Sequence, residues 1–175
     1  MEQGFQDKMK LRIAGVEKES IVDGEGYRYS IFTQGCPHAC PGCHNPQTHD
    51  AQGGHWTTLG ELLQDILSNP LLSGVTFSGG EPFQQAGELA ELARELHRHN
   101  LDVWCYTGYL YENLQAQGSP SQQALLAEVD VLVDGPYVEA QRDLNLAFRG
   151  SSNQRLLDMA ATRAQGTAVL YEMEY

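Results

Sequence analysis

The segment YRYSIFTQGCPHACPGCHN, residues 27–45, joins an alternating apolar run to a loop with three closely spaced cysteines. Aromatic and aliphatic residues alternate with polar ones from Tyr27 to Gln34, which predicts a β-strand. The loop that follows places Cys36, Cys40 and Cys43 in a C-x3-C-x2-C array. Three thiolates on one turning loop can bind one metal centre, so this segment predicts a strand that carries a site at its end.

Strand and helix patterns alternate downstream of this loop. Short apolar runs bounded by turn residues predict three further strands, at Gly74–Phe77, Leu101–Tyr106 and Val129–Val133. Apolar residues at helical spacing predict the intervening helices Leu59–Leu67, Ala86–His99, Leu110–Gln117 and Ser121–Glu128. This order predicts an α/β fold with a largely parallel sheet and right-handed crossovers.

The length of the chain limits the form of this sheet. A complete eight-unit barrel takes about 250 residues, and this chain has 175. We therefore expect a partial (open) parallel β/α barrel, with a flat doubly wound sheet as the alternative that periodicity leaves open. One domain should span residues 1–175, with residues 1–10 and about 159–175 as unassigned extensions.

Weaker patterns suggest the remaining elements. We expect an edge strand at Leu11–Val16, an exposed loop at Asn45–Trp56, a short helix at Gln154–Ala160 and a last strand at Thr167–Tyr171.

The composition limits the kinds of binding partner and the cellular location that we expect. Acidic residues outnumber basic ones by 23 to 11, for a formal charge of -12, which disfavours nucleic acid or an anionic membrane as partner. Met1–Lys10 lacks the pattern of a secretory signal, and no run approaches the ~20 apolar residues of a membrane helix. We expect a cytoplasmic protein, in which clustered cysteines are metal ligands or reactive thiols rather than disulfides. Cys105, alone on an apolar segment, should be a buried packing residue.

Each predicted parallel strand ends in residues that suit a binding site better than a core. The cysteine loop follows the first strand, and the other three strands run into Ser78–Pro82, Thr107–Tyr109 and Asp134–Tyr137. Ligands of parallel α/β sheets bind at the carboxyl ends of the strands, so we expect these four loops to meet over one site.

These strand ends offer particular chemistry. Gly79 and Gly80 let a ligand approach the backbone, Glu81 is placed to accept a cationic group, and Pro82 stiffens the exit. The next two strand ends add a hydroxyl, an approachable backbone and a carboxylate: Thr107, Gly108 and Asp134.

Two metal centres fit the cysteine loop. A structural zinc needs four ligands, which one of four histidines could complete: His44, His38, His49 or His55. An iron-sulfur cube normally takes four cysteines, so three would leave one iron open to another ligand. Zinc sites usually pair two short ligand turns, whereas all three thiols here come from one loop, which favours the cluster.

The cysteine array, followed by Gly79-Gly80-Glu81-Pro82 after the second strand, resembles the radical S-adenosylmethionine superfamily. Within it, the chain from Leu11 to Leu157 looks like the glycyl-radical-enzyme activases that act on anaerobic ribonucleoside-triphosphate reductase. The segments that carry this resemblance are Asp23–Gly26, Gly35–His38, Cys43–Asn45, Tyr106–Tyr109, Val131–Gly135 and Arg149–Arg155.

The resemblance implies a 4Fe-4S cluster on Cys36, Cys40 and Cys43, whose open iron binds the amino and carboxylate groups of S-adenosyl-L-methionine. It implies cofactor contacts at Gly79, Gly80, Glu81 and Pro82 for the methionine amino group, at Gly42, Cys43 and His44 for the adenine, and at Thr107, Gly108 and Asp134 for the remaining edge. Many superfamily members carry an aromatic residue where this chain has Gly42, so adenine packing must come from elsewhere, with His44 as a candidate.

The resemblance also implies a reaction and partners. One electron cleaves S-adenosylmethionine to methionine and a 5'-deoxyadenosyl radical, which abstracts hydrogen from a glycine of the anaerobic reductase. The electron would come from a donor such as flavodoxin or ferredoxin. An incomplete barrel would leave a lateral opening for the glycine-bearing loop, and Arg149–Arg155 would either contact the partner or close the sheet as a capped loop.

Two other functions stay open from the sequence. One is a radical S-adenosylmethionine enzyme for a small molecule, similar to 7-carboxy-7-deazaguanine synthase. The other is a zinc-stabilised binding protein without catalytic activity.

Overall fold

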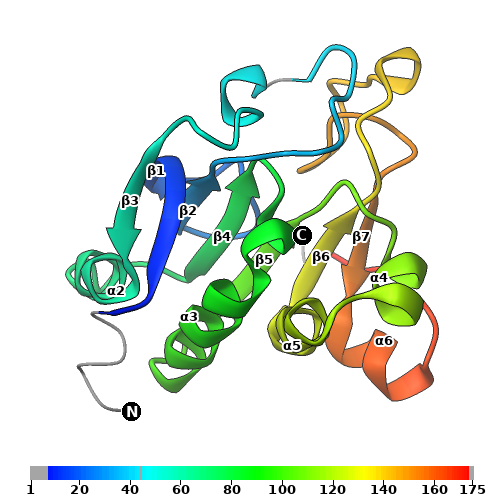
Figure 1. Cartoon of the computed structure of the whole chain (residues 1–175). Coiled ribbons are helices and arrows are strands. Elements are labelled where there is room, and N and C mark those ends of the chain that lie inside the picture. Colours follow the sequence, from blue (N-terminus) through cyan, green and yellow to red (C-terminus); the bar gives the residue numbers. More distant parts are fainter. Residues whose placement is uncertain (1–7, 44, 174–175) are drawn as a thin grey trace.

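The structure, a computed structural model, describes residues 8–43 and 45–173 and is built on one mixed sheet (Figure 1). Seven strands pair in the order β3-β1-β2-β4-β5-β6-β7 within these residues. Their bounds are β1 Lys10–Ser20, β2 Arg28–Thr33, β3 His55–Thr58, β4 Gly74–Gly79, β5 Asp102–Tyr106, β6 Val131–Asp134 and β7 Arg155–Asp158. The helices are α2 Leu59–Leu67, α3 Ala86–Arg98, α4 Tyr111–Gln117, α5 Pro120–Glu128 and α6 Met159–Gln165.

The centre of the sheet is parallel. Strands β2, β4, β5 and β6 pair in parallel, and they are the four strands that the apolar runs predict. The outer pairs, β1 with β2, β1 with β3 and β6 with β7, are antiparallel. The mixed α/β fold with a parallel-containing sheet is therefore confirmed, and the carboxyl ends of the four parallel strands lie at one edge.

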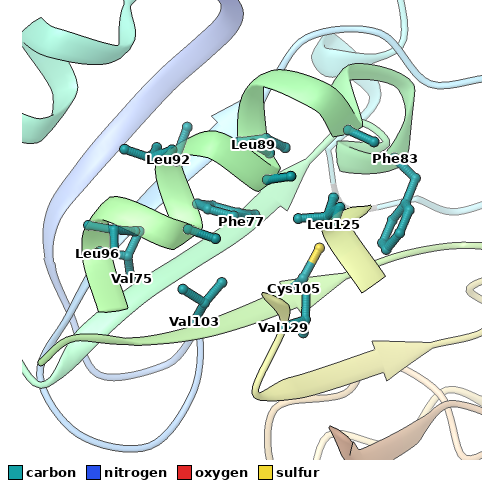
Figure 2. Packing of buried hydrophobic residues seen from close by; sticks show 14 of the residues in the cluster. Val75, Phe77, Phe83, Leu89, Leu92, Leu96, Val103, Cys105, Leu125 and Val129 are labelled. Carbon is teal, nitrogen blue, oxygen red and sulfur yellow. The ribbon is translucent and has the colours of Figure 1, made fainter. Parts of the chain in front are cut away.

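Helices cover one face of the sheet because their apolar residues pack against the apolar side chains on that face. In α3, Leu89, Leu92 and Leu96 recur at helical spacing and are buried against Phe77 and Val103 of the central strands (Figure 2). A capping box at Thr58 starts α2, where the Thr58 hydroxyl accepts the amide of Glu61.

Cys105 lies in this same layer. It is fully buried on β5 and packs near Leu125 and Val129 (Figure 2). Burial raises the pKa of its thiol well above the ordinary value, so it stays protonated at neutral pH. The prediction of a packing cysteine is confirmed.

The opposite face of the sheet has a smaller apolar cluster around Trp104, because residues alternate between the faces along β5. The C-terminal segment packs on it: the rings of Trp104 and Tyr171 meet edge to face at 5.5 Å. Beneath them, the fully buried Arg28 donates to Thr76 Oγ1 and Asp102 Oδ1, and its guanidinium lies 5.5 Å from the Trp104 ring centroid.

Some local predictions were wrong. Strand β1 is internal, because β3 pairs on its outer side at Ile13 and His55, inside the segment that we expected to be a loop. The expected helix at Gln154–Ala160 is instead β7 followed by α6, since Leu156 and Leu157 are buried on opposite faces of the sheet. At Thr167–Tyr171 the pairing amounts to an isolated bridge between Leu157 and Leu170 rather than a strand.

In the described part of the chain, no helix combines the length and the apolar character needed to span a bilayer.

Replacing Leu92 by Ala should lower the free energy of unfolding by about 2–5 kcal/mol, because it opens a cavity between α3 and the central strands. Urea denaturation of the metal-free chain measures this. Leu71→Ala is the control: Leu71 is 76% exposed, so its loss should change stability by less than about 0.5 kcal/mol. Equal effects of the two substitutions would contradict this core assignment.

Candidate functional site

A cavity of about 520 Å³ lies at the carboxyl ends of the parallel strands. Each of the four strand ends contributes to its wall. The lining includes Cys36, Cys40 and Cys43 after β2, Gly79 and Gly80 at the end of β4, Thr107 and Gly108 after β5, and Gly135 after β6. Loops that are far apart in sequence thus lie at the same edge of the sheet (Figure 1).

The three cysteines of the loop are free thiols and are partly exposed to this cavity. Backbone hydrogen bonds anchor the start of the loop: the amide of Gly35 donates to Thr48 O (2.6 Å), and that of Cys36 to His49 O (3.2 Å). Burial is the largest influence on the Cys36 thiol and raises its pKa.

Two groups contact the sulfur of Cys43. The amide of Asn45 donates to it at 3.5 Å, and His49 Nε2 lies 3.3 Å away. His49 also lines the cavity, so a sulfur ligand at this position has polar neighbours in addition to the metal centre.

The donor set fits an iron-sulfur cluster bound by three protein sulfurs. Thiolates are the ligands that such clusters prefer, and three of the chain's four cysteines line one cavity. The fourth, Cys105, is buried in the core. Among the described residues, no three Cys, His, Asp or Glu side chains converge in a way that would hold a single metal ion.

Gly42 is exposed and does not line this cavity. Its φ of +74° is a conformation that favours glycine, and a Cβ there would lie 2.6 Å from the Glu139 carboxylate. The positive φ disfavours a side chain at the position before the third cysteine, whereas the Glu139 carboxylate is the end of an exposed side chain that could move aside. His44, the predicted adenine contact, lies outside the described residues.

Gly79 and Gly80 are needed for close backbone packing as well as for access to the cavity. Gly79 has φ +92°, and a Cβ on it would lie 2.5 Å from the Thr33 amide nitrogen. A Cβ on Gly80 would overlap the carbonyl oxygen of Gly35. The end of β4 therefore lies directly against the start of the cysteine loop, and the amide of Glu81 donates to Gly35 O at 2.8 Å.

The carboxylate of Glu81 is fully buried behind the cavity wall. Its Oε1 accepts from the Gly108 amide (2.8 Å) and the Thr107 hydroxyl (2.9 Å), and it lies 2.6 Å from His38 Nε2. Its Oε2 accepts from the Phe83 amide (3.0 Å). The carboxylate is thus engaged by the protein and does not line the cavity.

Asp134 has a similar place at the end of β6. It is fully buried and accepts from Arg155 Nε (3.0 Å), Arg155 Nη2 (2.5 Å) and the Tyr111 amide (2.9 Å). Arg155 also pairs with Glu112, a contact that lowers the pKa of the Glu112 carboxyl, and its two carboxylate partners raise the pKa of the guanidinium. Neither Asp134 nor the buried Pro82 lines the cavity, whereas Gly135 does.

Hydrogen bonds within the segment Arg149–Arg155 hold its loop together, and part of this segment lines the cavity. Gln154 Oε1 accepts the amides of Gly150 and Ser151, and Arg149 Nη1 donates to Gln154 O at 3.1 Å. Arg149 and Gln154 are both among the residues that line the cavity.

The apolar part of the lining was missed from the sequence. Ile21 and Val22, before β2, and Leu144, before β7, line the cavity while staying 73%, 70% and 81% exposed. They therefore lie at its opening. The apolar pair before the turn at Asp23–Gly26 was a signal for this, but Leu144 stands in a polar segment with no pattern around it.

Comparison with known proteins gives consistent matches. A family model described as a 4Fe-4S single cluster domain matches residues 22–157. The anaerobic ribonucleoside-triphosphate reductase-activating protein of Haemophilus influenzae is 32% identical over 149 residues, covering 77% of this chain and 89% of that protein. The protein of the same name from Escherichia coli K12 is 34% identical over 144 residues, covering 77% and 90%.

Among solved structures, QueE from Escherichia coli aligns with a TM-score of 0.47 at 19% identity, covering 62% of this chain and 57% of that one. This TM-score is too low to assign a shared fold.

Replacing Arg155 by Met should destabilise the chain by about 3 kcal/mol, because it leaves the Asp134 carboxylate buried without its ionic partner. Chemical denaturation of the metal-free chain measures the change. Arg142→Met, at an exposed position, is the matched control and should have little effect. A loss at Arg155 no larger than that at Arg142 would show that the pair adds nothing to stability.

Proposed function

We propose a function from the premise that this chain belongs to the family of anaerobic ribonucleoside-triphosphate reductase-activating proteins. It is a radical S-adenosylmethionine enzyme that generates a glycyl radical on the anaerobic reductase. The observation that carries the proposal is the cavity in which three free cysteines of one loop face the glycine-rich ends of neighbouring parallel strands.

In this proposal Cys36, Cys40 and Cys43 hold a 4Fe-4S cluster. The cluster, when bound, supplies the electron that cleaves S-adenosylmethionine to methionine and a 5'-deoxyadenosyl radical, which takes a hydrogen atom from a glycine of the reductase. The work of the chain is to bind and orient the cofactor, to keep water from the reactive centre and to admit the glycine. The source of the electron, such as flavodoxin or ferredoxin, stays a prediction.

The cofactor would lie along the backbone of the strand ends. Gly79, Gly80 and Gly108 line the cavity without side chains, which lets the methionine group and the ribose come close to peptide groups. The Thr107 hydroxyl donates to Glu81 and accepts the Tyr109 amide, so one lone pair of its oxygen is left to accept from the cofactor. Arg149 offers donors to a carboxylate such as that of methionine.

In our proposal, three of the predicted cofactor residues support the cavity wall without lining the cavity. The side chains of Glu81, Pro82 and Asp134 are buried and absent from the lining, so they would support the strand ends that touch the cofactor. Adenine would lie near Cys43 and the adjoining Gly42 and His44.

The opening of the cavity supports a protein substrate. The exposed side chains of Ile21, Val22 and Leu144 form an apolar rim, with Asp23 and Asp143 beside it, around a space whose lining includes the three thiols and several glycines. Such a rim suits a peptide loop that carries glycine into the cavity, because it would be covered when the loop enters. We propose further that the sheet is the open part of a β/α barrel, whose missing side leaves room for this loop.

Anaerobic reconstitution with iron and sulfide tests the cluster. The wild-type chain should take up about four iron and four sulfide ions, while Cys36→Ala, Cys40→Ala and Cys43→Ala should each lose most of the cluster. Cys105→Ala is the matched control and should keep it, because Cys105 lies in the core. Zinc without iron or sulfide would exclude the enzyme.

The reaction has its own test. Reduced, reconstituted protein incubated with S-adenosylmethionine and an anaerobic reductase should give a glycyl radical signal in electron paramagnetic resonance. Cleavage of the cofactor without a glycyl signal would favour a small-molecule substrate.

Replacing Leu144 by Asp should lower the yield of glycyl radical about tenfold, because it places a charge in the apolar rim that the incoming loop covers. Cluster content and cofactor cleavage without the reductase should not change. Leu71→Asp, equally exposed but away from the cavity, is the control. A normal radical yield with Leu144→Asp would place the docking surface elsewhere.

A further inference from the structure

Glu81 attaches the cysteine loop to the end of β4 through two contacts, one from its amide and one from its carboxylate. The amide of Glu81 donates to Gly35 O, one residue before Cys36. Its carboxylate lies 2.6 Å from His38 Nε2, two residues after Cys36. The first cysteine therefore lies between two contacts with the same residue at the end of β4.

His38 is held on several sides. Its ring meets that of Tyr109 edge to face with centroids 4.6 Å apart. A Cβ at position 108 would come within 2.5 Å of the imidazole, so glycine there leaves room for the ring. The side chain is only 16% exposed, which means that its place is set by the ends of β4 and β5.

The loop needs such support because its backbone is strained. Ala39, the next residue, has φ +48°, a left-handed conformation that costs a non-glycine residue about 1 kcal/mol or more. The residues before Cys40 therefore keep this shape only if contacts outside the loop hold them. The contact between His38 and Glu81 is one such contact, directly beside Ala39.

The carboxylate of Glu81 links this contact to the cofactor edge. The same oxygen that meets His38 accepts the Gly108 amide and the Thr107 hydroxyl. The carboxylate is fully buried, so its donors cannot be exchanged for water without cost. Movement of His38 would therefore disturb the end of β5 together with the loop.

We propose that His38 and Glu81 are a positioning pair, which fixes the cysteine loop against the ends of β4 and β5 before any metal binds. Glu81 lies behind the cavity wall and His38 lines the cavity, but in this role the pair acts on the cysteine loop and not on the cofactor or the substrate. The purpose of the pair, to present Cys36 and Cys40 to a cluster, rests on the proposed function. Its effect on the loop does not, because the contact joins two protein side chains.

The test compares two substitutions at position 38. His38→Phe keeps an aromatic ring against Tyr109 and Gly108 but removes the nitrogen that meets Glu81. His38→Gln loses the ring but carries an amide N–H that reaches about as far as Nε2. Hydrogen exchange of the metal-free chain, measured by mass spectrometry, reports opening of the loop and of the end of β5.

With His38→Phe, exchange in residues 35–40 and 107–109 should rise about tenfold, the effect of losing one hydrogen bond to a buried charged group. With His38→Gln it should stay within about threefold of wild type. The iron and sulfide content after reconstitution should follow the same order. Gly108→Ala, which keeps the donor but pushes the ring away, should loosen the same residues.

His97→Phe is the matched control, because His97 contacts the carboxylates of Glu128 and Asp130 away from the cavity. It should leave exchange in the cysteine loop unchanged. Wild-type exchange with His38→Phe, or equal loosening with His38→Phe and His38→Gln, would overturn the positioning pair. Failure of the wild-type chain to bind a cluster would instead refute the proposed function and leave the exchange result standing.

Discussion

The buried carboxylate of Glu81 joins the parts of the molecule that carry its chemistry. It accepts hydrogen bonds from Thr107, Gly108 and Phe83 and contacts His38. A carboxylate without such partners would be costly to bury, so the folded chain must bring the cysteine loop and the end of β5 to it. The walls of the cavity are thereby fixed relative to one another by one group that lies behind them.

Asp134, a second buried carboxylate, links neighbouring elements at the end of β6 as Glu81 does at the end of β4. Asp134 ties β6 to β7 through Arg155 and receives the amide of Tyr111 at the start of α4. Glu81 and Asp134 thus support the strand ends from behind, while the three thiols, several glycine backbones and Arg149 are among the groups that line the cavity. This division suits a site for a cofactor with both amino and carboxylate groups, because backbone groups and Arg149 remain available to it.

The parallel centre of the sheet makes this arrangement possible. Each crossover between parallel strands returns the chain to the same edge, so the loops that follow the four strands lie there together. The helices shield one face, and the C-terminal segment packs against Trp104 on the other. The apolar side chains at the cavity opening are left uncovered, which agrees with a partner that supplies the remaining surface.

Local patterns in the sequence determined the four parallel strands, the helices between them and the cysteine array, because periodicity, caps and spacing are properties of neighbouring residues. They also placed Gly79, Gly80, Thr107 and Gly108 at strand ends, and the structure has them on the cavity wall. Only the tertiary structure decided that β3 and β7 extend the sheet, since short segments become strands by pairing with distant partners. Only the tertiary structure also decided the role of Glu81, whose carboxylate was expected from the sequence to accept a cationic group of a ligand. Its partners His38 and Thr107 are 43 and 26 residues away in the chain, a relation that no local pattern contains.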